Sequence, residues 1–405
     1  MRRKIKILKP EMPFEVKIAN TQEELEKAYS LLHDCYVGMK LMAPDASGLR
    51  CNFYSFLPYT STIVAKTEDM VIGTLSLIKD SNAGLPSDKD FKNENDKLRS
   101  QGHRLVEVSS LAIDKQFRNQ GHFVSLYLMK YLQHYSTHYM GCTTVTCVIH
   151  PRARDFYSCF WGFQASQKII KYKFVNDALG VQVFGHITDS VLSELENSFP
   201  QQNSKNPIKF LFKAEDFLIY PERKIQHLLD PVYTPELLNY FMMERTRVYE
   251  SLTPTELVTI YHSYKLFFDD LDHFYIFKGL NTDPFKRKIF RFFTLINATL
   301  IAPNEDRIDG LISDLSQNGT FFVTDNKIDP AISYSIKFEL DSQKFQIPVV
   351  LRWRNKRIRN SNRIGYGFEF SQIQLGIARV LKHTHMTIKT RQSRPSLKID
   401  SFKKI

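Results

Sequence analysis

The spacing of apolar residues in the N-terminal part of the chain predicts strands and helices in alternation. Period-two patterns indicate strands, and apolar residues three to four apart indicate helices. Thr21, with Glu24 three residues later, marks a helix start of the capping-box type. The predicted elements are a strand at 14–20, a helix at 21–38, a hairpin at 61–80 that turns at Glu68 and Asp69, a strand at 104–113, a helix at 122–139, a strand at 142–150 and a further element at 152–163.

The middle of the chain predicts helices with matching start signals. Residues 200–207 are polar and flanked by prolines, which suggests a loop or a domain boundary. Thr234 and Thr253 are each followed by a proline and then, within two more residues, by a glutamate. A capping threonine, a proline at the first helical position and an acidic residue near the helix dipole favour a helix start at both places. We expect an aromatic-rich helical connector over residues 208–282.

Short strands separated by frequent turns follow from about residue 285. They are predicted at 291–301, 308–314, 320–325, 333–340, 345–353 and 364–370, with a final helix at 371–382. This texture predicts a small β-barrel with a helix at its end. The basic residues after 386 form a tail that we expect to be loosely ordered.

Composition limits the number of domains, the cellular compartment and the kinds of metal site that we expect. At 405 residues the chain is long enough for two or three domains, and its apolar share of 43% is ordinary for a globular protein. The chain has no run approaching the ~18–20 apolar residues of a membrane span, and its basic start leads into no apolar signal core. Five cysteines without a C-x-x-C pair favour reduced thiols and argue against a zinc site. We expect a cytoplasmic protein without a metal.

The net charge of +12 lies entirely in the last third of the chain. Residues 286–405 carry 22 Lys or Arg and 10 Asp or Glu. Such asymmetry indicates an anionic partner, with a merely soluble basic surface as the alternative. Six of the basic residues lie within 352–363. This cluster is consistent with a solvated hairpin and equally with a surface that binds a ligand, a membrane or an acidic carrier protein.

Three polar side chains are candidates for the chemistry of the N-terminal domain. Glu107 lies on the strand that enters the turn, where a carboxylate can act as general base for an amine or position a water. Tyr157 could protonate a leaving thiolate, and His150 could take part in the chemistry. The alternatives are that Glu107 pairs with an arginine, that Tyr157 is a core aromatic and that His150 orients its loop. The cysteines of this region, which are predicted core positions rather than nucleophiles, are Cys142, Cys147 and Cys159.

The turn itself is a candidate phosphate cradle. Its residues are Arg118, Asn119, Gln120, Gly121, His122 and Phe123. Backbone N–H groups at a helix start bind phosphate, Arg118 adds a charge and Gly121 allows close approach. Phe123 stands where a small residue usually lets the helix close on a diphosphate. It therefore favours a donor with one phosphate, or it belongs to the apolar stripe of the helix.

Four stretches, at 31–50, 76–113, 117–122 and 149–163, together resemble the FeeM-type N-acyl amino acid synthases, relatives of the autoinducer synthases with a GNAT fold. The resemblance implies transfer of a long-chain acyl group from the phosphopantetheine arm of acyl carrier protein to an amino-acid amine. Glu107 matches the family's E-x-S strand, and His150 its H-P-R stretch. The chain departs at Ser87, where the family often has Met, and at Ala153, where it often has His, which leaves the acceptor open.

Two motifs open the predicted barrel, K-R-x-x-x-R and D-x-S-x-x-G. They comprise Lys286, Arg287, Arg291, Asp314, Ser316 and Gly319. Paired arginines can fork onto phosphates and stack on a purine. The aspartate can accept from a guanine edge, the serine can donate to phosphate or cap the turn, and the glycine permits a tight turn. With the later stretches at 349–353 and 365–370, the region from 284 to about 385 resembles the PilZ domain, which implies cyclic di-GMP binding by these six residues.

We therefore expect an α+β multidomain chain. Its parts are a GNAT-like α/β acyltransferase domain at 1–207, the helical connector at 208–282, a PilZ-like six-stranded β-barrel with a terminal helix at 283–386 and a basic tail at 387–405. The expected donor is acyl-phosphopantetheine of acyl carrier protein, or acyl-CoA, the regulatory ligand is cyclic di-GMP, and no nucleic acid is expected. The basic domain or the acylated product could contact a membrane peripherally. Two alternatives stay open, a cyclic di-GMP adaptor with a non-catalytic GNAT-like module and a coenzyme A-dependent N-acetyltransferase.

Overall fold

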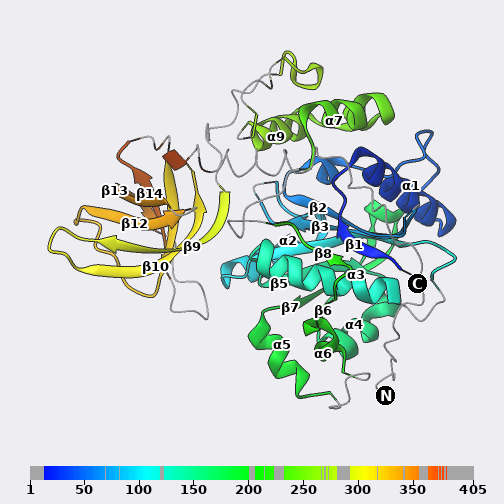
Figure 1. Cartoon of the computed structure of the whole chain (residues 1–405), viewed down its shortest axis with the longest axis horizontal. Coiled ribbons are helices and arrows are strands. Elements are labelled where there is room, and N and C mark those ends of the chain that lie inside the picture. The colour runs from blue at the N-terminus through cyan, green and yellow to red at the C-terminus, as the bar shows by residue number, and fades with distance from the viewer. Residues whose placement is uncertain are drawn as a thin grey trace, which may run out of the picture.

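An eight-stranded sheet forms the N-terminal part of the protein, in the order β6-β7-β5-β4-β3-β2-β1-β8 (Figure 1). Its strands are β1 (Glu15–Ile18), β2 (Thr60–Lys66), β3 (Val71–Lys79), β4 (Leu105–Ile113), β5 (Thr144–Ile149), β6 (Gln164–Tyr172), β7 (Ala178–His186) and β8 (Leu218–Ile219). The structure is a computed structural model that describes residues 13–68, 70–81, 83–118, 123–199, 206–213, 215–222, 232–265, 267–268, 271, 273–280, 292–316, 318–340, 343–354, 364–372, 374, 376–377 and 380.

Helices cover both faces of this sheet. They are α1 (Gln22–Gly38), α2 (Asp88–Ser100), α3 (Phe123–His134), α4 (Arg154–Trp161), α5 (Asp189–Glu196), α6 (Pro207–Phe212), α7 (Pro235–Asn239), α8 (Val248–Ser251) and α9 (Pro254–Tyr264). Short 3-10 helices lie at Phe53–Phe56, Pro151–Ala153, Lys173–Val175 and Tyr275–Phe277, and π-helical turns at Tyr135–Tyr139 and Tyr240–Arg245. The strands and helices predicted for residues 14–163 are present, whereas α2 was not predicted.

The helices α1 and α3 lie on opposite faces of the sheet. Gly73 of β3 faces α3, because a Cβ atom at this position would lie 2.6 Å from Cγ1 of Val124. The next residue, Thr74, is paired with Ala112 of β4, which packs against Cys35 of α1. Since successive side chains of a strand alternate between faces, these contacts define an α1 face and an α3 face.

The N-cap predicted at Thr21 is present, but the capping box is incomplete because the Glu24 carboxylate accepts from the Asn20 N–H instead of the Thr21 N–H. The Oγ1 atom of Thr21 accepts a hydrogen bond from the Glu24 N–H at 3.2 Å. The Glu24 carboxylate also accepts from Lys17 at 2.9 Å and from Lys66 of β2 at 3.0 Å. The capping residues therefore connect the helix to the adjoining strands and also define where it begins.

Residues 208–282, expected to be a connector, pack largely into the first domain. β8 is paired in parallel with β1, which makes this segment an edge of the sheet. The side chains of Leu238, Phe241 and Tyr264 are fully buried in the same hydrophobic core as the sheet. The helix starts themselves are as predicted, since Thr234 caps α7 and Thr253 forms a capping box at α9.

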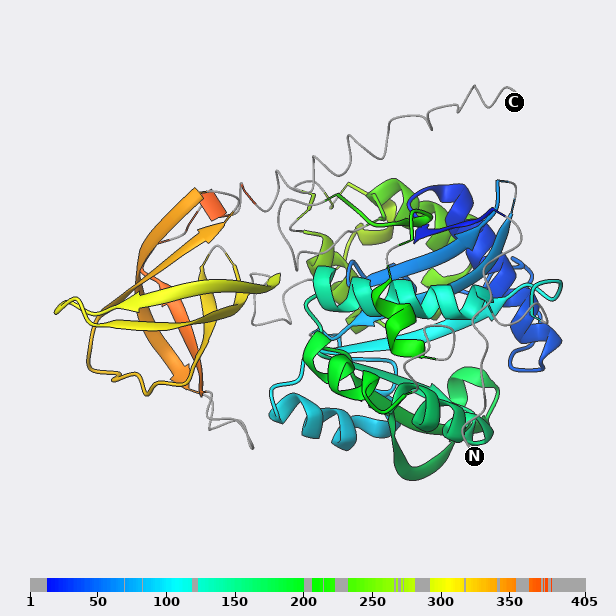
Figure 2. The ribbon, with the colours of Figure 1, turned by 60° about the horizontal axis from the view of Figure 1, so that its bottom comes forward.

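The C-terminal part is a closed antiparallel barrel in the order β10-β11-β14-β13-β12-β9 (Figures 1 and 2). Its strands are β9 (Phe292–Ile301), β10 (Arg307–Leu315), β11 (Gly319–Thr324), β12 (Tyr334–Leu340), β13 (Gln343–Arg354) and β14 (Ile364–Phe370). All six predicted strands are confirmed, and they enclose a second hydrophobic core. The tail, half of the predicted terminal helix and most of the basic hairpin lie outside the described residues.

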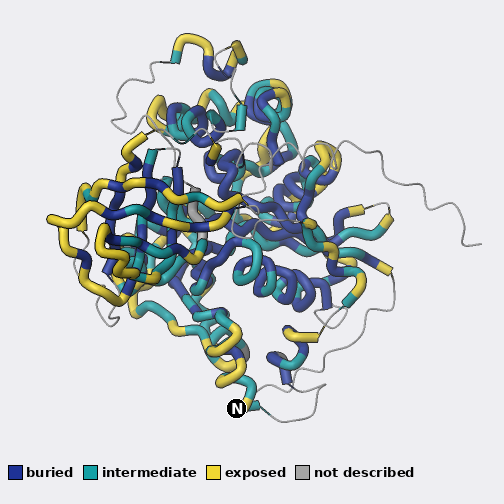
Figure 3. Tube along the Cα trace, turned by 60° about the vertical axis from the view of Figure 1, so that its left-hand side comes forward, coloured by how far each residue is buried: buried dark blue, intermediate teal, exposed yellow. Residues whose placement is uncertain are grey.

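The central strands of the sheet are mostly buried, whereas the edge strand β6 and the barrel strand β13 also carry exposed residues (Figure 3). Phe267, after α9, packs against both hydrophobic cores. No described helix combines the length and the apolar character needed to cross a lipid bilayer. In the same residues, no group of His, Cys, Asp and Glu side chains is arranged to hold a metal ion.

Phe241→Ala tests whether the segment expected to be a connector is part of the first domain's core. The Phe241 ring lies 5.8 Å from those of Tyr29 and Tyr233, so its loss should lower the free energy of unfolding by about 3–5 kcal/mol. Urea denaturation measures the change. Tyr275→Ala is the control, because this ring is 66% exposed and its loss should cost less than about 0.5 kcal/mol. Equal, small effects of both variants would contradict the shared core.

Candidate active site

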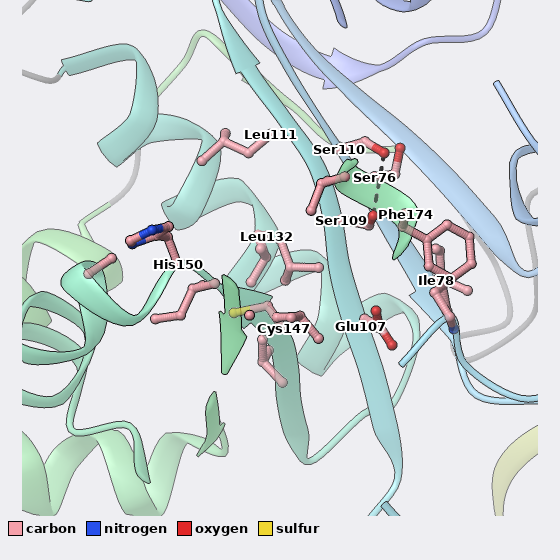
Figure 4. A pocket seen from close by; sticks show the side chains of 18 of the residues that line it. Ser76, Ile78, Glu107, Ser109, Ser110, Leu111, Leu132, Cys147, His150 and Phe174 are labelled. Carbon is pink, nitrogen blue, oxygen red and sulfur yellow. Dashed lines mark hydrogen bonds between the residues drawn. The ribbon is translucent and has the colours of Figure 1, made fainter. Parts of the chain in front are cut away.

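Strands β4 and β5 run parallel, but their pairing is short. It comprises Leu105–Thr144, Val106–Val145 and Glu107–Thr146. Past this point β4 stays paired with β3, and β5 stays paired with β7. In the described chain the facing edges of β4 and β5 are therefore unpaired beyond Glu107, and a cavity opens between them (Figure 4).

The cavity has a volume of about 570 Å³ and is lined from both faces of the sheet. On the α1 face its walls include Tyr36, Arg50 and Tyr54, which are polar or aromatic. On the α3 face they are largely apolar, with Gln133 as a polar exception, and include Met129 and Leu132 of α3 and, from later segments, Ile187, Leu192 and Leu211. A cavity of this size accommodates a small organic ligand, and its two ends differ in polarity.

Glu107 lies where the β4–β5 pairing stops. Its partner on the neighbouring strand β3 is Ile78, so its side chain points to the α1 face. Figure 4 shows Ile78 and Phe174 on this same side of β4. The residue is only 2% exposed, and its Oε2 atom accepts from the Ser87 N–H at 3.0 Å. Burial raises the pKa of Glu107 to about 7, although hydrogen bonds from the hydroxyl and N–H of Ser87 oppose the increase. The carboxyl can therefore gain or lose a proton near neutral pH.

A buried chain of amides and hydroxyls holds Ser87 in place. Asn95 of α2 donates to Ser87 Oγ at 2.9 Å, and Gln182 of β7 donates to Asn95 Oδ1 at 2.7 Å and to Thr146 Oγ1 at 2.9 Å. All four residues are almost fully buried. Buried polar networks of this kind fix side-chain positions, and here one atom, Oε1 of Gln182, has no hydrogen-bond partner among the described residues. The chain links α2, β5 and β7 to the carboxylate.

Arg99 fixes α2 itself. Its guanidinium forms fork-like hydrogen bonds to both carboxylate oxygens of Asp80 at 2.7 and 2.9 Å and to both of Asp88 at 2.8 and 3.0 Å. Asp80 and Asp88 also raise the pKa of Glu107, after the larger effect of burial. Asp88, Asn95 and Arg99 recur at helical spacing, a signal in the sequence by which this network could have been found.

A β-bulge follows Glu107 on β4. Thr74 and Ser76, two residues apart on β3, are opposite Ala112 and Ser109, which are three apart. Ser110 has a φ of +58°, a left-handed conformation that is uncommon for residues other than glycine. The hydroxyls of Ser109 and Ser110 lie 3.4 Å apart on the cavity wall (Figure 4). Bulges often turn side chains towards active sites.

Tyr157 and His150 also line the cavity, in different settings. Tyr157 is on α4, and burial raises the pKa of its phenol, so the phenol stays protonated at neutral pH. His150 is exposed, and its Nδ1 accepts from the Arg152 N–H at 3.2 Å at the start of the 3-10 helix Pro151–Ala153. This bond matches the interpretation that His150 orients its loop.

The cysteines divide into two groups. Cys142 and Cys147 are buried, as predicted, and burial raises the pKa of Cys142 to about 11 and that of Cys147 as well. Both are therefore thiols rather than thiolates near neutral pH. Cys159, predicted to be a core position, is exposed, because it lies on the solvent side of the short helix α4.

The candidate phosphate loop is described only at its ends. Arg118 donates from Nε to the Ile113 carbonyl at 2.8 Å and from Nη2 to Cys35 Sγ at 2.9 Å. Phe123 is the first residue of α3, and its ring is buried against that of Phe14 at 5.6 Å. It belongs to the apolar stripe of the helix, so only its backbone is placed to meet a phosphate. Asn119, Gln120, Gly121 and His122 lie outside the described residues.

The second predicted site lies at the turn between β10 and β11. Ser316 is buried, and its Oγ accepts from Gly319 N at 3.1 Å, so the hydroxyl serves the turn. Gly319 is required by close packing, because a Cβ atom there would lie 2.3 Å from the Phe368 carbonyl oxygen. Asp314 is half-buried beside a bulge in β10. Lys286, Arg287 and Arg291 lie outside the described residues.

Comparison with family models gives two matches. Residues 27–182 match the model of the N-acyl amino acid synthase FeeM, and residues 285–383 match that of the PilZ domain. The chain joins a FeeM-like acyltransferase segment to a PilZ domain. No match was found among curated proteins.

Solved structures of both kinds are similar to parts of the chain. FeeM, an N-acyl amino acid synthase from uncultured soil microbes, has 19% identity and a TM-score of 0.38, covering 50% of this chain and 99% of its own. BjaI, a coenzyme A-dependent acyl-homoserine lactone synthase, has 16% identity and a TM-score of 0.36, covering 54% and 97%. Escherichia coli YcgR in complex with cyclic di-GMP has 15% identity and a TM-score of 0.22, covering 26% and 47%.

The FeeM-like segment contains the whole of the β4–β5 opening but not all of the cavity. It ends at residue 182, so Ile187, Leu192 and Leu211, which line the apolar end, come from outside the matched region. Our sequence interpretation missed Arg50 and the roles of Asn95 and Gln182. Arg50 and Gln182 have partners far away along the chain, since Arg50 and Phe174 are 124 residues apart and Gln182 and Asn95 are 87 apart.

The raised pKa of Glu107 predicts a pH-dependent cost to stability. Because the unfolded state ionises from about pH 4.5 and the folded state from about pH 7, the stability of the wild type should fall across this interval and then level off. Glu107→Gln removes this cost, so its gain over wild type should increase with pH towards about 3 kcal/mol. Urea denaturation at several pH values measures the difference. Glu194→Gln, an exposed substitution on α5, is the control, and a parallel pH response of both variants would contradict the assignment.

Proposed function

We propose that the protein transfers a long-chain acyl group from a thioester donor, acyl carrier protein, to the amine of an amino acid, and that cyclic di-GMP regulates this activity. One observation carries the proposal. A titratable carboxyl, Glu107, lies at the point where β4 and β5 separate around a cavity with one polar end and one apolar end. The proposed substrates differ in the same way, because the acyl chain of the donor is apolar and the amino acid is polar.

The chemistry requires two proton transfers from the acceptor nitrogen. Glu107 takes one proton from the ammonium group, and the free amine attacks the thioester carbonyl carbon. A carbon–nitrogen bond forms, and the carbon–sulfur bond breaks. Tyr157 passes its phenolic proton to the departing sulfur, and the second proton of the nitrogen replaces it on the phenol. The products are the N-acyl amino acid and the free thiol, and Glu107 returns its proton to water.

The open edge of β4 supports a phosphopantetheine donor. Beyond Glu107, the backbone groups of this edge have no strand partner in the described chain. Such an edge can pair with an extended ligand that carries amide groups, as the phosphopantetheine arm does. The donor phosphate would lie at the start of α3, near Arg118 and the residues 119–123. The buried ring of Phe123 leaves only the backbone for this purpose, which suits the single phosphate of a carrier protein.

The apolar walls on the α3 face support a long acyl chain. Met129 and Leu132 of α3 line the cavity together with Leu192 of α5 and Leu211 of α6. Burial of each methylene contributes about 0.8 kcal/mol, so such a wall favours long chains over acetyl. The acetyl group of a short-chain acetyltransferase would fill only a small part of this cavity.

The acyl transfer is tested by incubating the full chain with long-chain acyl carrier protein, or with the matching acyl-CoA, and a mixture of amino acids. Mass spectrometry should detect an N-acyl amino acid. Glu107→Gln should lower the rate about 10²–10⁴-fold, because it removes the general base, whereas Cys147→Ala should keep most of the activity. Absence of product with either donor would support the non-catalytic adaptor instead, and product formed only with acetyl-CoA would support the acetyltransferase.

Binding of cyclic di-GMP is tested by calorimetry with the full chain. We expect the wild type to bind it and Arg287→Ala to lose binding, because the paired arginines fork onto phosphate. Arg307→Ala, an exposed arginine at the other end of β10, is the matched control and should bind as the wild type does. Regulation predicts that the ligand changes the acylation rate of the wild type but not that of Arg287→Ala. Lack of binding to the wild type would overturn this half of the proposal.

A further inference from the structure

The polar end of the cavity contains one residue with a permanent positive charge, Arg50. Among the described lining residues it is the sole arginine or lysine, and Glu107 is the sole acid. It lies in the segment between α1 and the 3-10 helix Phe53–Phe56. The polar end therefore combines a general-base carboxyl with a single guanidinium.

The contacts of Arg50 are neutral. Its Nη2 donates to the Phe174 carbonyl at 2.6 Å, its Nη1 donates to Met42 Sδ at 3.4 Å, and its Cζ lies 4.4 Å from the centroid of the Tyr36 ring. Within the part of the chain that the structure describes, no ion pair joins Arg50 to a carboxylate. Burial lowers the pKa of Arg50, which reflects its loss of water. A guanidinium has five N–H donors in a fixed fork, and a buried one usually faces an anion.

Tyr172 links Arg50 to Glu107 through the cavity wall. It lines the cavity, and after burial Glu107 is the largest cause of the raised pKa of this phenol. The ring of Tyr172 lies 5.4 Å from that of Phe174, whose carbonyl accepts from Arg50. Figure 4 shows the Phe174 side chain on the same side of β4 as Glu107. One small ligand can then reach the base and the guanidinium together.

We propose that Arg50 binds the carboxylate of the acceptor, so that the site selects amino acids over amines that lack a carboxylate. The inference rests on the proposed function. The acceptor places its ammonium towards Glu107 and its carboxylate on the fork of Arg50, with Tyr36 beneath the guanidinium. The contacts with Met42 and Phe174 use at most two of the five N–H donors of Arg50. The remaining donors are therefore available to a carboxylate in the cavity.

Arg50→Gln tests this role with paired acceptors. The amino acid that gives product in the mixed assay is compared with its own carboxamide, which keeps the amine and the side chain but lacks the charge. The wild type should prefer the free acid, and Arg50→Gln should lower kcat/KM for the free acid about 10–100-fold with little change for the carboxamide. This range corresponds to one or two charge-assisted hydrogen bonds. The loss should appear mainly in KM, because the carboxylate takes no part in bond making.

Arg245→Gln is the matched control. Arg245 donates to the Ser47 carbonyl at 2.8 Å in the same segment but does not line the cavity, so this variant should keep the preference for the free acid. Thermal unfolding identifies any loss of fold in either variant. With fold retained, an equal loss for both acceptors in Arg50→Gln, or a wild type that uses both acceptors equally, would overturn the role of Arg50 alone. A wild type that acylates neither acceptor would overturn the proposed function as well.

Discussion

Three residue pairs join the two halves of the N-terminal sheet, and the rest of the site depends on how early this pairing ends. Had β4 and β5 remained paired over their full length, the sheet would be closed and both faces would be filled by side chains. Instead the strands separate after Glu107 and Thr146, so a cavity lies within the sheet rather than on its surface. The backbone edge, the carboxyl and the two chemically different faces all meet at this opening.

The buried position of Glu107 explains both its pKa near neutrality and its cost to folding stability. A carboxyl buried to 2% exposure holds its proton more tightly than one in water, because the charged form loses solvation. The opposing hydrogen bonds from Ser87 keep the pKa near neutrality instead of higher. Ser87 is in turn held by Asn95 and Gln182. The side chains that tune this carboxyl therefore come from the start of α2, from α2 itself and from β7, and they do not line the cavity.

Much of this fold could be predicted from the sequence, since strong local patterns fixed β4, α3 and all six barrel strands. Glu107 was found because it lies on a recognisable strand. The helix α2 was missed because it is almost entirely polar, burying Phe91, Asn95 and Leu98, and it depends on ion pairs such as Arg99 with Asp80. Local patterns revealed helices in residues 208–282 but not the core that they join. Arg50 was missed because its surroundings come from distant segments.

The two ends of the cavity are built from different kinds of structure. The apolar end rests largely on regular elements, such as α3 and β5, whereas Arg50 and Asn52 lie in a connecting segment and Phe174 lies in the short 3-10 helix between β6 and β7. Asn176 ties two of these segments together by donating to the Lys40 carbonyl at 3.2 Å. Connections tolerate substitution better than strands and helices do. Substitutions in these connections can therefore change the shape and polarity of this end of the cavity, while the sheet that carries Glu107 keeps its fold.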